Sequence, residues 1–220
     1  MKVGVLGRGD VGKQLASGLA RRHHDVMLGT RSPADPGLKE WLAQSGGGVR
    51  SGTFAEAAVH GEMIVLAAKG DSADAVIELA GVPHFGHKLV IDAMNPLDFS
   101  HGFPPGLLNG VGESLGERVQ RKLPEAKVVK CFNTVPHLLM VDPSLVNGVA
   151  ELLICGDDAG AKERVGALVR TLGWSGVIDL GGIKEAYWQE AMVPLWVRVA
   201  AAKQNFAIAF TVANGPPPPS

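Results

Sequence analysis

Three closely spaced glycines follow the first apolar run of the chain. Gly7, Gly9 and Gly12 lie in the segment GRGDVG, between a strand-like run at residues 2–6 and a helical pattern at residues 11–22. A G-x-G-x-x-G spacing alone is weakly specific, but this position between a strand and a helix is typical of a dinucleotide-binding loop. The glycines permit a tight turn, close approach of a pyrophosphate, and close packing of the helix on the strand. We therefore predict that a dinucleotide phosphate is bound by Gly7, Arg8, Gly9, Asp10, Val11 and Gly12.

The end of the second predicted strand, at residues 25–28, indicates which dinucleotide is bound. An NAD site usually holds an acidic residue there, about 20 residues past the glycines, to accept from the ribose 2′-hydroxyl. Here the strand end reads LGTRS, without a carboxylate, and Asp25 lies at the opposite end of the strand. Arg31 can form a bidentate pair of hydrogen bonds with a 2′-phosphate, and Thr30 and Ser32 can add hydroxyl donors. The pattern favours NADP over NAD; the alternative for Arg31 is a solvated surface side chain.

Three further strand ends carry small or amide residues. In a doubly wound sheet, ligands bind outside the carboxyl ends of the strands, so these segments are expected beside the ribose and nicotinamide. For each residue, ordinary loop capping is the alternative, and Lys69 is either a phosphate ligand or solvated. Asn133 has the groups to bind a carboxamide or a substrate oxygen. The predicted cofactor contacts of these segments are Ala67, Ala68, Lys69, Asn95, Pro96, Asn133, Thr134 and Pro136.

No nucleophile or general base stands out in the sequence. The seven histidines do not form a metal-ligand pattern, and we predict no metal site. The two cysteines, Cys131 and Cys155, lie in apolar runs, as is usual for buried free thiols. This pattern fits hydride transfer, in which the cofactor carries the chemistry and the protein orients it. Asn133 and His137, both near the predicted cofactor edge, are the two catalytic candidates.

Strand-like runs alternate with helical patterns along the chain, which predicts an α/β fold with a doubly wound, mainly parallel Rossmann-like sheet. Capping boxes are expected at Thr53 with Glu56 and at Ser114 with Glu117, and Asp71 is expected to cap a further helix. Residues 94–112 are expected to form a long loop. We predict an NADP-binding domain at residues 1–180, a helical segment at 181–213 that Pro194 kinks or breaks, and a disordered tail at 214–220.

Composition excludes several classes of protein. The chain has 220 residues, of which 46% are hydrophobic and 20% charged, so it is globular rather than disordered. The net charge of −1 argues against a nucleic-acid partner. No apolar stretch reaches the roughly 18 residues of a membrane span, and the amino terminus has no signal-peptide pattern. We expect a cytoplasmic protein that acts on a small molecule.

Five blocks occur in an order that resembles a known family: KVGVLGRGDVG, LGTRS, DAMNPL, KVVKCFNTVP and LLICGDD. Together they resemble the F420-dependent NADP oxidoreductases, and they are also similar to the cytoplasmic reductase domain of STEAP-type metalloreductases. The resemblance extends to about residue 213. It implies direct hydride exchange between NADP and coenzyme F420, an 8-hydroxy-5-deazaflavin. Two departures are the pair Ala68-Lys69, where the family often has proline and an aromatic residue, and a loose match at residues 183–196.

The sequence is compatible with three functions. The first is hydride transfer between NADP(H) and coenzyme F420, the second is NADPH-dependent reduction of a flavin or metal chelate, and the third is a non-catalytic NADP-sensing module. Residues 183–213 have more apolar surface than one covering helix needs. We therefore expect this segment to pack against a second subunit in a homodimer and to form part of the acceptor pocket; the alternative is that it only covers the monomer's own sheet.

Overall fold

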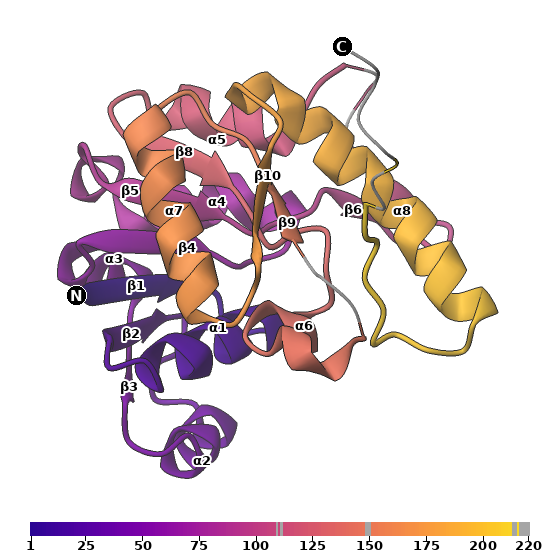
Figure 1. Ribbon diagram of the computed structural model, residues 1–220. Helices are drawn as coiled ribbons and strands as arrows, with labels where there is room; N and C mark the ends of the chain where they lie inside the picture. Colours follow the sequence, from indigo (N-terminus) through magenta and orange to yellow (C-terminus); the bar gives the residue numbers. More distant parts are fainter. Residues whose placement is uncertain (109, 111, 148–150, 213–214, 216–220) are drawn as a thin grey trace.

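A six-stranded parallel sheet forms the centre of the computed structural model, which describes residues 1–108, 110, 112–147, 151–212 and 215 (Figure 1). Its order is β3-β2-β1-β4-β5-β8, and every neighbouring pair is parallel. This is the doubly wound order of dinucleotide-binding sheets, so the predicted fold class is confirmed. The strands are β1 (Lys2–Leu6), β2 (Asp25–Gly29), β3 (Val49–Gly52), β4 (Met63–Leu66), β5 (Leu89–Asp92) and β8 (Lys127–Lys130).

Helices cover both faces of the sheet because its strands are apolar on both sides. Val3 and Val5 of β1 face a core formed with α1, α6 and α7, whereas Leu6 faces a second core formed with α3, α4 and α5. Successive strand residues point to opposite faces, so each apolar strand contributes to both cores. The helices are α1 (Asp10–Ala20), α2 (Pro36–Gln44), α3 (Phe54–His60), α4 (Ala73–Ala80), α5 (Leu115–Lys122), α6 (His137–Met140), α7 (Ala159–Thr171) and α8 (Ala186–Ala202).

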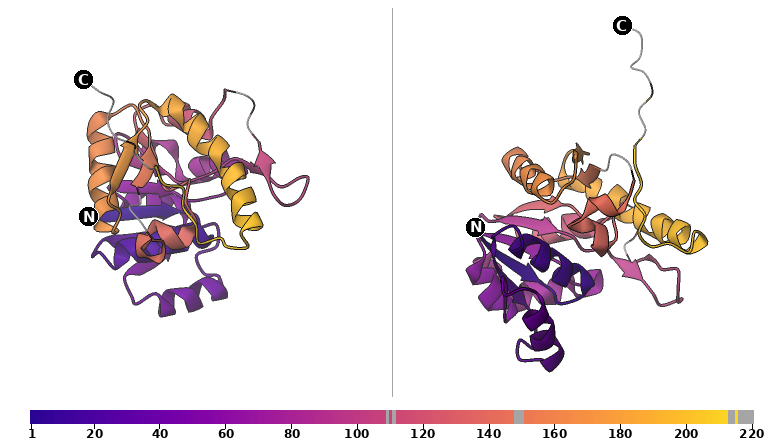
Figure 2. Two further views of the ribbon diagram at one scale, coloured as in Figure 1. Left: turned by 45° about the vertical axis from the view of Figure 1, so that its right-hand side comes forward. Right: turned by 60° about the horizontal axis from the view of Figure 1, so that its bottom comes forward.

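Two further parallel strands do not join the central sheet. β9 (Glu151–Ile154) and β10 (Gly176–Asp179) pair in parallel as a separate two-stranded sheet, with α7 between them in the sequence. Backbone hydrogen bonds between Lys130 and Cys155 link the end of β8 to the end of β9. The long loop predicted after β5 contains a short antiparallel hairpin of β6 (Leu97–Asp98) and β7 (Gly106–Leu107). In both views of Figure 2, this hairpin and α8 lie together on one side of the molecule.

The carboxyl-terminal part is helical over a shorter range than predicted. A 3-10 turn at Ile183–Glu185 leads into α8, which continues through Pro194 without a break and ends at Ala202. The helix stops because Gln204 adopts a left-handed conformation, φ 50°, and the next N–H bonds back to the Ala200 carbonyl. Residues 203–212 then return along α8, where the Trp196 indole donates to the Ile208 carbonyl at 3.0 Å. The predicted tail at 214–220 lies outside the described residues except for Gly215.

Of the three predicted helix caps, one is present as predicted, one is present in part and one is absent. The capping box of Thr53 and Glu56 is present in both directions, so that prediction is confirmed. Ser114 accepts from the Glu117 N–H, but the Glu117 carboxylate accepts from the Ser114 hydroxyl and not from its backbone. Asp71 was wrong as a cap, because a 3-10 turn at Gly70–Ser72 precedes α4 and the Asp71 carboxylate accepts from the Ser72 hydroxyl.

Candidate active site

The glycine-rich loop joins β1 to α1 at the carboxyl edge of the sheet, and each glycine meets a different environment. Gly7 has a positive φ of 133°, and a Cβ there would overlap the Ala67 carbonyl group. A Cβ at Gly12 would overlap the Gly7 carbonyl group. A Cβ at Gly9, by contrast, would have no heavy atom within 4 Å. Gly7 and Gly12 are therefore required for packing, whereas Gly9 borders open space at the start of α1.

No side chain caps the amino terminus of α1, as is also the case at α4, α6 and α8. Helices α2, α3, α5 and α7 are all capped by side chains, which accept from an N–H in the first turn. The first turn of a helix leaves N–H groups without intrahelical partners, and together with the helix dipole they attract anions. The residues that do this capping elsewhere are Asp35, Thr53, Ser114 and Asp158. The start of α1, beside Gly9, is thus available to a phosphate.

The end of β2 presents an unpaired cation at the same edge. Thr30 is buried, and its hydroxyl oxygen accepts from the Ser32 N–H at 3.3 Å, which fixes the turn after the strand. Arg31 is exposed, and no carboxylate of the described residues pairs with it. Arg8 of the glycine-rich loop instead pairs with Asp35 at 3.0 Å, and this contact holds the pKa of the Asp35 carboxyl below its usual value. The Arg31 guanidinium is therefore free to bind an anion beside α1.

Two amide side chains meet where β5 and β8 end. The Asn95 amide donates to the Asn133 carbonyl at 2.8 Å, and the Asn133 amide donates to Asn95 Oδ1 at 3.0 Å. Asn133 is 3% exposed, and its Oδ1 atom is buried without a hydrogen-bond partner. Buried acceptors in native proteins are nearly always hydrogen-bonded, so an orphaned one at a ligand-binding edge indicates a missing donor. The pair thus fixes Asn133 and leaves one acceptor for a ligand.

The segment after β8 turns sharply to present this amide. Phe132 has a left-handed φ of 68°, which is costly for a bulky side chain and is concentrated at functional sites. Its ring is fully buried in the core, so packing holds the residue in this conformation. Thr134 is also buried, and Pro136 directly precedes α6. His137, the first residue of α6, is half-buried.

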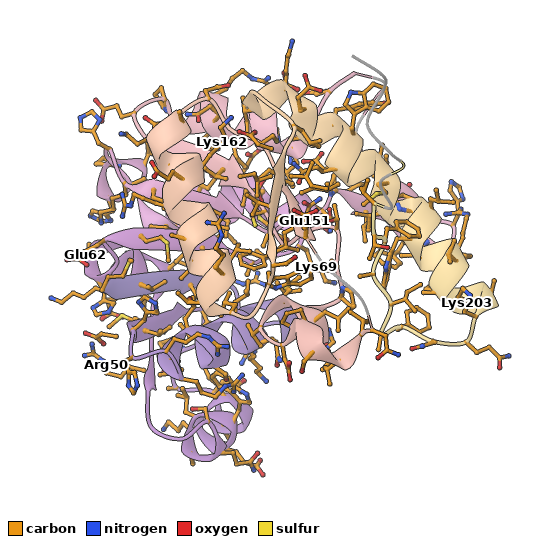
Figure 3. The ribbon with its side chains drawn as sticks, viewed as in Figure 1. Arg50, Glu62, Lys69, Glu151, Lys162 and Lys203 are labelled. Carbon is orange, nitrogen blue, oxygen red and sulfur yellow. The ribbon has the colours of Figure 1, made fainter. Side chains whose placement is uncertain are left out.

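The segment after β4 completes the edge. Ala67 is buried against the glycine-rich loop, and Gly70 packs so closely on the Asn95 carbonyl that a Cβ would overlap it. Ala68 is half-buried, while Lys69 is exposed and has no acidic partner among the described residues. Figure 3 shows Lys69 at the carboxyl edge of the sheet, whereas Glu62, which precedes β4, lies at the opposite edge. The structure therefore gathers all the predicted cofactor segments at one edge.

The residues present at this edge fit NADP. An uncapped helix start with open space at Gly9 suits the pyrophosphate, and unpaired Arg31 suits a 2′-phosphate. The orphaned Asn133 Oδ1 suits the amide N–H of a nicotinamide. Among the described residues no group of three or more potential ligands could hold a metal ion.

A buried ion cluster behind this edge was missed from the sequence. Lys130 Nζ lies 2.9 Å from Asp92 Oδ2 and 2.7 Å from Glu190 Oε1, and all three side chains are almost fully buried. Burial disfavours the charged form of Lys130, but the two carboxylates outweigh that effect and raise its pKa. The available signal was a lysine and an aspartate within otherwise apolar strands, since buried charges require partners. The sequence did not indicate that Glu190 supplies the third group.

Both cysteines are buried and free, as expected. Burial raises the pKa of the Cys131 thiol and raises that of Cys155 to about 12, so neither is a thiolate near neutral pH. Neither residue therefore has the low pKa of a reactive thiol.

Comparison with known proteins places the chain in a family. Residues 2–96 match the family described as coenzyme F420-dependent NADP oxidoreductase. The chain is 31% identical over 207 residues to an F420-dependent NADP reductase from Methanocaldococcus jannaschii, covering 90% of this chain and 91% of that protein. It is 30% identical over 205 residues to the metalloreductase STEAP3 of Rattus norvegicus, covering 89% of this chain but only 38% of that longer protein.

A solved structure agrees over almost the whole chain. A candidate F420-dependent NADP-reductase from Arthrobacter sp. FB24 superposes with a TM-score of 0.93 and 40% identity, covering 97% of this chain and all of that one. None of the helices that the structure describes has the length and apolar character to cross a membrane. The sheet order and the uncapped start of α1 agree with these similarities. The chain belongs to the family of coenzyme F420-dependent NADP oxidoreductases.

Proposed function

We propose that this chain is an enzyme that transfers hydride between NADP(H) and a deazaflavin such as coenzyme F420. The cofactor half of the proposal is carried by one observation: an uncapped helix start at Gly9 lies at the same sheet edge as the unpaired guanidinium of Arg31. The acceptor half is supported by the similarity to the Methanocaldococcus jannaschii reductase over nearly the full length of both chains.

Each segment of the edge would have its own task in binding the cofactor. The backbone N–H groups of the glycine-rich loop, residues 7–12, would bind the pyrophosphate. Arg31, with the hydroxyls of Thr30 and Ser32, would bind the 2′-phosphate and select NADP over NAD. The small residues Ala67 and Ala68 would leave room beside the cofactor, while Lys69, Asn95, Pro96, Asn133, Thr134 and Pro136 would line its remaining length.

Hydride transfer requires orientation more than acid–base catalysis. Bound NADPH supplies the hydride from its nicotinamide ring. Asn133, held by Asn95 and by the strained turn at Phe132, would fix the plane of that ring through its orphaned Oδ1. His137, half-buried at the start of α6, would face the acceptor. Direct transfer would then require the acceptor atom to lie within about 3–3.5 Å of the donor carbon.

The helical segment would complete the acceptor site and form a homodimer. Trp188 and Leu195 lie two turns apart on α8 and are 64% and 58% exposed, so the helix has an apolar stripe that the monomer does not cover. A second copy of this chain would bury it. Size-exclusion chromatography with light scattering tests this, and a monomer at micromolar concentration would refute it.

The proposed cellular location is the cytoplasm, and cell fractionation tests it.

A flavin or a metal chelate is the second candidate acceptor. The similarity to rat STEAP3, a metalloreductase, favours it. Because this chain spans only 38% of that protein, the similarity extends to one part of it and not to its whole activity.

Anaerobic mixing of the purified protein with NADPH and oxidised F420 tests the proposal directly, with the deazaflavin absorbance as the signal. We expect rapid bleaching with NADPH and much slower bleaching with NADH. The parallel reactions contain a flavin or a ferric chelate in place of F420. Oxidation of NADPH by one of these alone would replace the proposed acceptor, and tight NADPH binding without oxidation by any of them would favour an NADP-sensing module.

A further inference from the structure

A fully buried ion cluster joins the nicotinamide edge to the carboxyl-terminal helix. Lys130 Nζ donates to Asp92 Oδ2 at 2.9 Å and to the Met94 carbonyl at 2.7 Å, and it pairs with Glu190 Oε1 at 2.7 Å. Replacing such a cluster by apolar residues of similar size is often neutral or stabilising, so fold stability alone is a weak reason for it. The segments that it holds indicate another role.

On one side, the cluster holds the backbone of Met94 from both directions. Lys130 binds the Met94 carbonyl, and Asp92 Oδ1 accepts from the Met94 N–H at 2.9 Å. The next residue is Asn95, whose side chain exchanges hydrogen bonds with Asn133. Lys130 itself ends β8, only three residues before Asn133. Both amides at the edge are therefore one or a few residues from an atom that the cluster fixes.

On the other side, the cluster holds two helices. Glu190 lies in α8, and its carboxylate accepts from the N–H groups of Leu115 and Gly116 at the start of α5, at 2.8 and 3.0 Å. The positive end of the α5 dipole further stabilises this carboxylate. Gly116 allows the close approach, because a Cβ there would overlap the Ala186 side chain of α8. The position of α8 is thus set by the same charged groups that fix Met94.

We propose that Lys130, Asp92 and Glu190 are positioning residues that hold the Asn95–Asn133 pair and helix α8 in register, so that donor and acceptor rings meet in a transfer-competent geometry. This inference rests on the proposed function, because it assigns the nicotinamide to the Asn133 end of the edge. The cluster touches neither ring itself. Its loss should alter the nicotinamide end of the site and leave the adenosine end intact, since residues 7–12 and Arg31 follow β1 and β2, whereas the cluster joins β5, β8 and α8.

The test uses the variant Glu190→Gln, which keeps the size of the side chain and removes its charge. The adenosine end and the nicotinamide end of the site are measured separately. Lys127→Gln is the matched control, since Lys127 lies on the same strand as Lys130 but pairs at the surface with Asp158. We would measure binding of 2′,5′-ADP, the fluorescence of bound NADPH, and the single-turnover rate of hydride transfer. We expect 2′,5′-ADP affinity within twofold of the parent protein, an altered NADPH emission, and a transfer rate at least tenfold lower.

A purely structural cluster predicts a different result. If Glu190→Gln melts at a lower temperature but keeps the parental NADPH emission and transfer rate well below that temperature, the proposal is wrong. Weakened 2′,5′-ADP binding would overturn it as well, because the effect would then not be confined to the nicotinamide end. A parent protein that binds neither 2′,5′-ADP nor NADPH would instead refute the proposed function.

Two further measurements keep the proposal testable if Glu190→Gln does not fold. Lys130→Gln retains a donor for Met94 and is judged by the same criteria. In the unaltered protein, hydrogen exchange should slow on NADP⁺ binding both at residues 93–95 and at Leu115 and Gly116, which Glu190 binds. Slowing at residues 93–95 without any at the start of α5 would show that the cluster does not couple the two segments and would overturn the proposal.

Discussion

Gly9 and Gly12 are only three residues apart, yet the fold should tolerate alanine at Gly9 and be destabilised by alanine at Gly12. At Gly9 the backbone has φ −71° and ψ −178°, which alanine adopts readily, and the added methyl meets no atom within 4 Å. We expect Gly9→Ala to fold with a stability change of about 1 kcal/mol or less, the scale of a substitution at a helix amino terminus. At Gly12 the methyl overlaps the Gly7 carbonyl group, so Gly12→Ala should displace α1 from β1 and lower the melting temperature sharply.

The binding effect of Gly9→Ala follows from the space that its methyl would occupy. The proposal has a phosphate in that space, hydrogen-bonded to the start of α1. Losing one charge-assisted hydrogen bond costs about 1.5–3 kcal/mol, which corresponds to a rise of about 10- to 150-fold in the dissociation constant for NADPH. Isothermal titration calorimetry at fixed ionic strength measures it, alongside a thermal melt of each variant.

The control is Gly106→Ala, since Gly106 in β7 also has no heavy atom within 4 Å of an added Cβ and lies outside the glycine-rich loop. Its NADPH affinity should match that of the parent protein. A well-folded Gly9→Ala protein with parental NADPH affinity would refute the assignment of the pyrophosphate to this loop.

Three other substitutions test the 2′-phosphate site, the cap of α3 and the buried thiol of Cys155. Arg31→Ala should weaken NADPH binding by about 1.5–3 kcal/mol and leave NADH binding nearly unchanged; equal losses for the two cofactors would contradict the 2′-phosphate assignment. Thr53→Ala removes the capping hydroxyl of α3 and should lower the urea-unfolding free energy by about 1 kcal/mol. Burial raises the pKa of Cys155 from its ordinary 9.0 to about 12, so its contribution to stability is complete below pH 9 and is lost as the pH rises toward 12. Cys155→Ala should therefore remove about 1 kcal/mol of the stability loss between pH 9 and pH 10; an unchanged pH dependence would mean that this thiol is not buried in solution.

Local sequence determined much of the fold and of the cofactor edge. Apolar strands, the alternation with helices and the position of the glycines were sufficient to predict the doubly wound sheet. Its strands end together at one edge because neighbouring parallel strands share a direction. Every predicted cofactor segment consequently lies there, including those at Arg31 and Asn133. The capping box at Thr53 was equally predictable, because both of its hydrogen bonds join residues three positions apart.

Tertiary structure decided the features that depend on partners far away in the chain. The Asn95–Asn133 pair spans 38 positions, and Glu190 meets Leu115 across 75 positions, so no local pattern specifies either contact. The separate pairing of β9 with β10 has the same origin, since it joins residues about 25 positions apart. A buried lysine in an apolar strand requires a carboxylate, and Asp92 lies opposite Lys130 on the neighbouring strand, but only the packing of α5 and α8 brings Glu190 to the same lysine.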